Sequence, residues 1–208
     1  MLSVLNNNFS LSKTVVAHHM NIALIDNFDS FTYNLVHILE QFADEIQVVR
    51  YNLVQIDSLE QYDRIILSPG PGLPSDLEKL NQIIEMYSSL KPILGICLGH
   101  QAIAEYFGAK LKNLKEPDHG IQKNTIVIDK KEILFREIPE KFLSGRYHSW
   151  AANDRNFPDE LKITAIDEDN RIMGISHKTL NIKGLQFHPE SIMTEYGKEI
   201  LENWIKYS

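Results

Sequence analysis

The stretch KPILGICLGHQAIAEYF, residues 91–107, decides the fold and contains the single cysteine of the chain, Cys97. Within it, the apolar run from Ile93 to Ile96 predicts a short buried strand, and the segment from His100 to Phe107 has the apolar spacing of a helix. Between them lies a G-x-C-x-G pentapeptide, residues 95–99. Its two glycines leave room for the tight strand-to-helix turn that lifts a nucleophile out of a sheet. The stretch therefore predicts a strand, a turn and a helix, with Cys97 at the turn.

The predicted position of Cys97 is suited to a reactive thiol. The unpaired N–H groups and the dipole at a helix N-terminus favour the thiolate, which is the reactive form of cysteine. A lone cysteine in an apolar run is also compatible with a small buried hydrophobic residue. The stretch alone leaves both interpretations open, so the question becomes whether the chain supplies a base.

A candidate base lies in GLQFHPES, residues 184–191. Apolar and polar residues alternate here as in a strand, with Gln186 and His188 on the polar side and Pro189 stopping the ladder. Glu190 follows two residues after the histidine, and its carboxylate can hold the imidazole in one tautomer and stabilise the imidazolium. The alternative is a histidine that ends a strand and a glutamate that begins a helix. A nucleophile and a base at two strand ends together favour a catalytic site.

The turn SPGPGLP, residues 68–74, contains three prolines and two glycines, which predict a rigid segment with an accessible backbone. Beside a nucleophile, fixed backbone N–H groups can form an oxyanion hole. Pro71 has no N–H, so Gly70 is the expected donor, with Leu98, the residue after the nucleophile, as the second. A plain surface turn is the alternative interpretation.

Up to Phe107 the chain alternates strands and helices, which predicts a doubly wound, mostly parallel sheet with its sites at the carboxyl ends of the strands. From Ala109 the pattern changes to short segments of period two, which predict an antiparallel extension containing a loop from Tyr147 to Trp150. The expected strands are residues 21–26, 46–50, 64–67, 93–96, 125–128, 162–166 and 171–176, and the expected helices run to about Gln41, over 77–90, over 100–107 and over 196–207.

Composition limits the classes of function. The chain has 208 residues, 43% hydrophobic and 24% charged, which predicts one globular domain. A net charge of −7 without a lysine and arginine cluster argues against nucleic-acid binding. One cysteine excludes an internal disulfide, and no apolar run reaches the roughly 18 residues of a membrane span, so we expect a cytoplasmic protein. Residues 1–19 are expected to be a disordered extension or the result of an upstream start before Met20, with the domain over residues 20–208.

These motifs together resemble the class I glutamine amidotransferases. The resemblance rests on GICLGHQ, GLQFHPES and SPGPGLP, with DNFDSFTYN at residues 26–34, in the order of the family, and it runs from about Met20 to the C-terminus. Within the family, the chain is most similar to the glutamine-hydrolysing small subunits of anthranilate synthase and aminodeoxychorismate synthase. The resemblance implies a three-layer, flavodoxin-like α/β fold.

The resemblance also implies roles for particular residues. Cys97, His188 and Glu190 would form the catalytic triad. The implied substrate-binding residues are Gly70, Pro71, Gly72, Leu98, Gln101, Ser149 and Trp150. A plain solvated helix residue is the alternative for Gln101. The chain departs from the family at Ile121, where lysine is common, and at Ser176, where arginine is common.

The implied reaction is glutamine hydrolysis, with ammonia passed to a separate chorismate-using synthase subunit. The chain is expected to need no cofactor or metal, because its histidines lack ligand spacing and Cys97 lacks a partner cysteine, and Mg²⁺ is expected on the synthase. Anthranilate, for tryptophan biosynthesis, is the favoured product. Three alternatives stay open: aminodeoxychorismate as product, a stand-alone cysteine hydrolase or peptidase, and a non-catalytic binding module.

Overall fold

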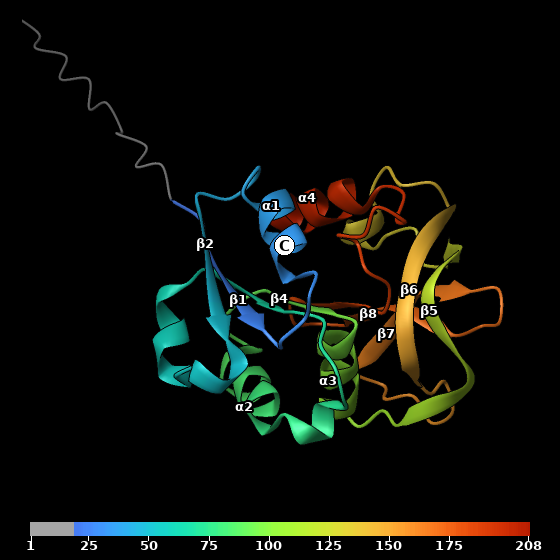
Figure 1. The fold of residues 1–208 in the computed structure, drawn as a ribbon, viewed down its shortest axis with the longest axis horizontal. Helices are drawn as coiled ribbons and strands as arrows, with labels where there is room; N and C mark the ends of the chain where they lie inside the picture. Colours follow the sequence, from blue (N-terminus) through green and yellow to red (C-terminus); the bar gives the residue numbers. More distant parts are fainter. Residues whose placement is uncertain (1–18) are drawn as a thin grey trace, which may run out of the picture.

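The computed structural model describes residues 19–208. The expectation of a disordered extension concerns residues 1–19 and so lies, except for its last residue, outside the described part. A nine-stranded sheet with strand order β2-β1-β3-β4-β9-β8-β7-β5-β6 runs through the molecule (Figure 1). Neighbouring strands pair in parallel from β2 through β1, β3 and β4 to β9. From β9 through β8, β7 and β5 to β6, neighbouring strands pair antiparallel. The α/β class, the mostly parallel centre and the antiparallel extension are thereby confirmed, and the extension continues the same sheet.

The strands have these bounds: β1 Asn21–Asp26, β2 Glu45–Arg50, β3 Arg64–Leu67, β4 Ile93–Ile96, β5 Leu111–Val127, β6 Lys141–Ala152, β7 Leu161–Asp167, β8 Ile172–His177 and β9 Ile182–Leu185. The α-helices are α1 Thr32–Leu39, α2 Glu78–Tyr87, α3 Leu98–Tyr106 and α4 Gly197–Tyr207. Short 3-10 helices span Tyr51–Leu53, Ile56–Gln61, Pro74–Asp76 and Ile133–Phe135.

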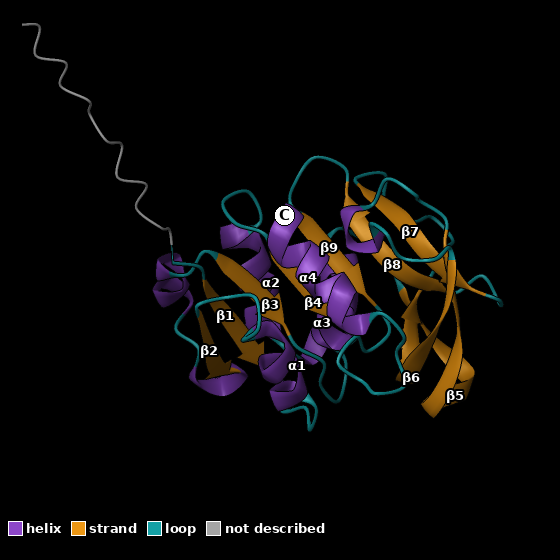
Figure 2. Ribbon diagram, turned by 90° about the horizontal axis from the view of Figure 1, so that it is seen from above, coloured by secondary structure: helices purple, strands orange, loops and turns teal. Residues whose placement is uncertain are grey.

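Helices cover both faces of the parallel half of the sheet. In β1, Ile22 and Leu24 belong to the apolar cluster that contains residues of α1 and α4. Ala23 and Ile25 point the other way, into the cluster built with α2 and α3. Because successive side chains of a strand face opposite sides, each central strand contributes to two cores. Figures 1 and 2 show the resulting three layers, with α1 and α4 on one side of the sheet and α2 and α3 on the other.

The antiparallel part differs from the sequence prediction in one respect that affects the site. Residues 147–150 were expected to form a loop, and this is wrong, because they lie within β6 and pair with β5 from Asn113 to His119. Two register shifts in β5 accompany this pairing. The polar residues buried in β6, among them Arg146 and His148, hide the apolar alternation by which a strand is normally found.

The first helix begins without a side-chain cap. The residue before the helix is Phe31, and no side chain binds the free N–H groups of the first turn. The Asp29 carboxylate instead accepts a hydrogen bond from the Phe31 N–H at 2.7 Å. This turns the chain before the helix rather than within its first turn.

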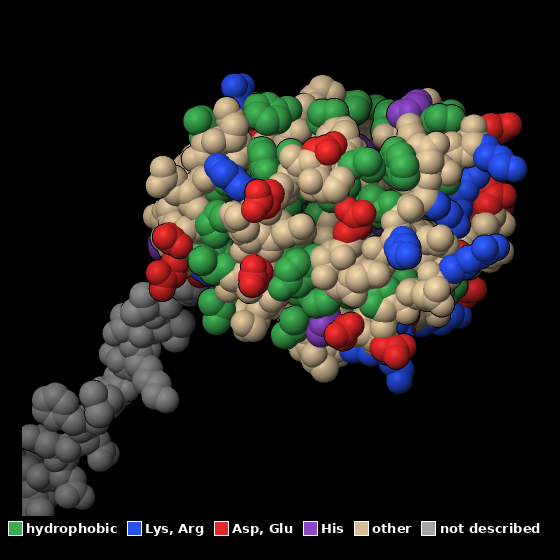
Figure 3. Space-filling view, turned by 90° about the horizontal axis from the view of Figure 1, so that it is seen from below, with side chains coloured by type: hydrophobic (Ala, Val, Ile, Leu, Met, Phe, Trp, Pro, Cys, Tyr) green, Lys and Arg blue, Asp and Glu red, His purple; other side chains and the backbone are tan. Residues whose placement is uncertain are grey.

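No helix within residues 19–208 is both long and apolar enough to cross a lipid bilayer. On the face of the molecule shown in Figure 3, acidic side chains are interspersed with lysines and arginines. This face therefore carries no continuous basic patch of the kind that binds nucleic acid.

Candidate active site

The turn between β4 and α3 holds Cys97 in an uncommon backbone conformation. Its φ is 49° and its ψ is −98°, and the residue is 6% exposed. A Cβ on Gly95 would lie 2.4 Å from the Gly99 carbonyl, and one on Gly99 would lie 2.2 Å from the Leu67 carbonyl oxygen. Both glycines of the G-x-C-x-G motif are therefore required by close backbone packing. Strained backbone of this kind persists where surrounding packing enforces it, as at nucleophile elbows.

The HPE segment leaves the sheet beside this turn. β4 and β9 are parallel neighbours, and the Cys97 N–H donates to the Leu185 carbonyl at 2.7 Å. His188 was predicted to lie at the end of the strand. β9 ends at Leu185, so His188 instead lies three residues beyond it. The carboxyl ends of two adjacent parallel strands thus bring the nucleophile and the candidate base to the same edge of the sheet.

His188 and Glu190 form a buried pair. The imidazole Nδ1 lies 2.7 Å from Glu190 Oε1, and the two side chains are 2% and 0% exposed. Because a carboxylate accepts, Nδ1 carries the proton, which leaves Nε2 with a free lone pair in the neutral ring. The rings of Tyr147 and Phe31 pack against the imidazole, with centroids 4.9 and 6.1 Å away. Glu190 thus holds the His188 imidazole through Nδ1, as the sequence predicted.

The charge state of His188 is set by competing effects. Burial lowers the pKa of His188, but the charges of Cys97 and Glu190 and the hydrogen bonds of the ring raise it well above its ordinary value. A raised pKa favours the imidazolium, which is the cation that a cysteine hydrolase sets beside its nucleophile.

The SPGPG turn packs directly on the elbow. A Cβ on Gly70 would lie 2.6 Å from Asn27 and 2.8 Å from Leu98 Cδ2. The Asn27 side-chain amide and backbone N–H bind Ser68 at 2.9 Å each, which fixes the turn against the end of β1. Leu98 is the first residue of α3, so the helix itself has no acceptor for its N–H. The Leu98 side chain thus packs against Gly70, and the role of the two residues as oxyanion donors stays a prediction.

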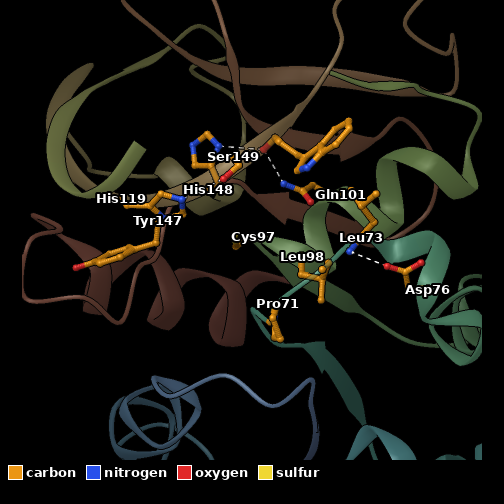
Figure 4. A pocket seen from close by; sticks show the side chains of 13 residues that line it. Pro71, Leu73, Asp76, Cys97, Leu98, Gln101, His119, Tyr147, His148 and Ser149 are labelled. Atoms are coloured by element: carbon orange, nitrogen blue, oxygen red, sulfur yellow. Dashed lines mark hydrogen bonds between the residues drawn. The ribbon is translucent and has the colours of Figure 1, made fainter. Parts of the chain in front are cut away.

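A cavity of about 400 Å³ opens over Cys97 (Figure 4). One wall is the SPGPG turn, another is the start of α3, and a third is β6. All seven predicted substrate-binding residues line it: Gly70, Pro71, Gly72, Leu98, Gln101, Ser149 and Trp150. The volume suits a small polar molecule, and the structure thus places these residues around one space above the nucleophile.

Gln101 joins two walls of this cavity. Its Nε2 donates to the Trp150 carbonyl at 2.8 Å and to Gln186 Oε1 at 3.2 Å. Both amide hydrogens are thereby used within the protein, so what Gln101 can offer a substrate is its Oε1. The Trp150 carbonyl is likewise occupied, which leaves other backbone groups of β6 for substrate recognition.

Sequence reasoning assigned no role to two further residues at the site. His148 lines the cavity, and its Nδ1 lies 3.0 Å from the Trp150 carbonyl. Burial first, and then the charge of Arg146, lower the pKa of His148 to about 3, so the ring is neutral near pH 7. Gln186 is fully buried, and its Nε2 donates to Cys97 Sγ at 3.7 Å. The only sequence signal for Gln186 was its alternation with His188, which placed both side chains on one face.

Among residues 19–208, no group of three or more His, Cys, Asp or Glu side chains is placed to hold a metal ion.

Comparison with known proteins agrees with this geometry. The family Glutamine amidotransferase class-I matches residues 23–207. Anthranilate synthase component 2 of Pyropia yezoensis is 41% identical, over 90% of this chain and 100% of the relative. Aminodeoxychorismate/anthranilate synthase component 2 of Bacillus subtilis is 38% identical, over 89% of this chain and 95% of the relative.

A solved structure from Thermoplasma acidophilum, described as one subunit of a GMP synthase, superposes with a TM-score of 0.81 at 29% identity. The superposition covers 90% of this chain and 93% of the other. Fold, sequence and the elbow with its buried histidine and glutamate thus agree, and the chain belongs to the class I glutamine amidotransferase family.

Proposed function

We propose that the chain hydrolyses glutamine through a thioester on Cys97 and delivers the ammonia to a chorismate-using synthase subunit. The observation that carries the proposal is the strained elbow of Cys97 beside the buried His188–Glu190 pair, under a cavity lined by all the expected substrate-binding residues.

The proposed reaction has two halves, formation of the thioester and its hydrolysis. His188 takes the thiol proton, and the Cys97 thiolate attacks the side-chain amide carbon of glutamine. The negative charge on the oxygen of the tetrahedral intermediate is stabilised by the N–H groups of Gly70 and Leu98. The C–N bond then breaks, His188 returns the proton to the leaving nitrogen, and ammonia and a γ-glutamyl thioester result. A water molecule, deprotonated by His188, attacks the thioester, and glutamate leaves as the thiol is restored.

Ammonia from this site requires an acceptor, and the names of the relatives supply one. Proteins named component 2 of anthranilate synthase imply a component 1, and we propose that this chain assembles with such a synthase. We further propose that the chain itself needs no cofactor, while the synthase binds chorismate and Mg²⁺. Anthranilate is the favoured product, since the name of the Pyropia relative refers to anthranilate alone. Aminodeoxychorismate is the second candidate, because the Bacillus relative carries both names.

The test combines the purified chain with a candidate anthranilate synthase or aminodeoxychorismate synthase large subunit, glutamine, chorismate and Mg²⁺, and separates the aromatic products. Glutamine-dependent anthranilate supports the favoured product, and aminodeoxychorismate supports the second. We expect the chain alone to be a poor glutaminase, because hydrolysis of glutamine without an acceptor for the ammonia would waste the nitrogen donor. Full glutaminase turnover that no partner changes would instead favour a stand-alone hydrolase.

Whether Cys97 is the nucleophile is tested separately. A diazo-ketone analogue of glutamine should label Cys97 and no other residue, as read by mass spectrometry of a digest. A label elsewhere, or labelling that excess glutamine fails to reduce, contradicts the proposed mechanism.

A further inference from the structure

Gln186 is a buried amide that touches the reacting sulfur. It follows β9, is 0% exposed, and its backbone N–H donates to the Met173 carbonyl at 3.0 Å. Its side chain makes two hydrogen bonds, one from Nε2 to Cys97 Sγ at 3.7 Å and one at Oε1 from Gln101 Nε2 at 3.2 Å. Burying an amide costs free energy unless its groups are hydrogen-bonded, so a leucine of similar size would suit a purely structural role at this position.

The direction of these hydrogen bonds is fixed from the far wall of the cavity. The Trp150 carbonyl can only accept, so Gln101 must turn its NH₂ group toward it, at 2.8 Å. The second hydrogen of the same NH₂ group points at Gln186, which must then present its oxygen to Gln101. As a result Gln186 turns its own NH₂ group toward the sulfur. Reversing either amide would place two oxygens or two NH₂ groups against each other.

His148 strengthens the fixed end of this chain of hydrogen bonds. Its Nδ1 lies 3.0 Å from the same Trp150 carbonyl, and since a carbonyl only accepts, Nδ1 carries the hydrogen. Two donors from different parts of the chain thus hold one carbonyl of β6. The sulfur at the other end receives an N–H. An N–H directed at sulfur stabilises the thiolate more than the thiol, because a neutral thiol sulfur is only a weak acceptor.

We infer that Gln186 is a thiolate-stabilising residue of the glutaminase site, oriented by Gln101 and the Trp150 carbonyl. This inference rests on the proposed function and adds to the triad a neutral donor that acts on the nucleophile before substrate is attacked. His188 and Gln186 then serve the sulfur in different ways: His188 removes and returns the proton, and Gln186 stabilises the charge that remains.

The experiment measures the rate of Cys97 alkylation by iodoacetamide from about pH 5 to about pH 10, because the thiolate is the form that reacts. Gln186→Leu removes the donor at similar volume, and Gln186→Glu replaces it by an acceptor in the same shape. We expect Gln186→Leu to raise the pH of half-maximal reaction by about 1 unit, the size of a hydrogen bond to a charged group. Gln186→Glu should raise it further, because a carboxylate repels the thiolate. Glutaminase kcat should fall about 10-fold in Gln186→Leu, with a change in KM below about threefold.

The matched control is Gln82→Leu, which removes an exposed glutamine from α2 and should leave the profile, the activity and the melting temperature unchanged. Folded Gln186 variants with the profile and kcat of the unmodified protein would overturn the inference.

If both Gln186 variants fail to fold, Gln101→Leu tests the same point, because it keeps Gln186 but frees its amide to turn. A smaller upward shift is then expected, and an unchanged profile contradicts the inference. Alkylation is read without glutamine, so failure of the proposed function, seen as absent glutamine hydrolysis and absent diazo-ketone labelling by the unmodified protein, is a separate result.

Discussion

The two halves of the cavity are built in opposite ways. The elbow side consists of a four-residue strand, fully buried, and two glycines at which an added Cβ would overlap the backbone of α3 and β3. The β6 side is a long strand at the edge of the sheet, paired with an even longer β5 through two register shifts. Backbone contact leaves the elbow no freedom, whereas β6, besides its ladder with β5, is joined to the elbow side by side-chain hydrogen bonds such as that of Gln101. Close backbone packing therefore fixes the atom that reacts, and polar side-chain contacts position the β6 residues that line the cavity.

This contrast predicts that changes on the elbow side abolish activity or stability, while changes on the β6 side have graded effects. The largest effect is expected at the nucleophile itself. Cys97→Ala should lower glutamine-dependent turnover by about 10⁴-fold or more, because no thioester can form. Ammonia-dependent product formation by the assembled complex should persist, since only the glutaminase step is lost. Product assays with glutamine and with ammonium salt check this, and equal loss of both would show that Cys97 is needed for folding or assembly.

A smaller loss is expected when the orientation of the base is removed. Glu190→Gln should lower kcat by about 10²- to 10⁴-fold, because the imidazole loses both its fixed tautomer and the carboxylate that stabilises its charge. Steady-state glutaminase kinetics with the partner present give the measurement. Glu85→Gln, an exposed carboxylate of α2, is the control, and a Glu190→Gln enzyme within about threefold of the unmodified kcat contradicts the role.

The same variant tests the ion pair through stability against pH. Burial lowers the pKa of His188, but Cys97 and Glu190 raise it above the ordinary value, so the folded pKa lies above that of the unfolded chain, about 6.5. A raised pKa gives stability that is complete below the unfolded value and is lost as pH rises through the folded value. Glu190→Gln should therefore lower the free energy of unfolding more at about pH 6 than at about pH 9. Denaturant unfolding at both pH values measures this, and a larger effect at the higher pH contradicts it.

The difference between the halves also explains what the sequence could predict. The strand Ile93–Ile96 was predicted to the residue, because a short, wholly apolar run between turn residues leaves few alternatives. The triad could be predicted from the chemistry of thiol, imidazole and carboxylate. The sequence did not reveal β6. One reason is that Arg146 is fully buried and donates hydrogen bonds to Thr125 and Asn124, partners that no local pattern reveals.

Gln186 and His148 escaped prediction for the same reason. Both are neutral side chains whose hydrogen bonds join segments far apart in the chain, so their contacts exist only in the folded protein.

Two glycines allow the contrast to be measured as stability. Gly99→Ala should lower the free energy of unfolding by about 3 kcal/mol, since the added Cβ would lie 2.2 Å from the Leu67 carbonyl and backbone must move. Gly120→Ala, in a bulge of β5, should cost about 1 kcal/mol, from its φ of +65° alone, because the nearest atom is 4.0 Å away. Denaturant unfolding of both variants compares the values. Equal costs would show that the elbow accommodates the methyl group, and that its rigidity is not set by backbone contact.

The smallest effect is expected at Ser149, whose side chain contacts His119 and no residue of the triad. Its Oγ lies 3.0 Å from His119 Nε2 in an exposed contact at the cavity, whereas the predicted role in substrate binding belongs to the backbone. Ser149→Ala leaves that backbone in place and removes one exposed hydrogen bond, which contributes about 1 kcal/mol or less. We therefore expect the KM for glutamine to change by less than about threefold and kcat to stay the same. A rise in KM of about tenfold or more would mean that the hydroxyl itself binds glutamine, and that the β6 wall recognises substrate through its side chains.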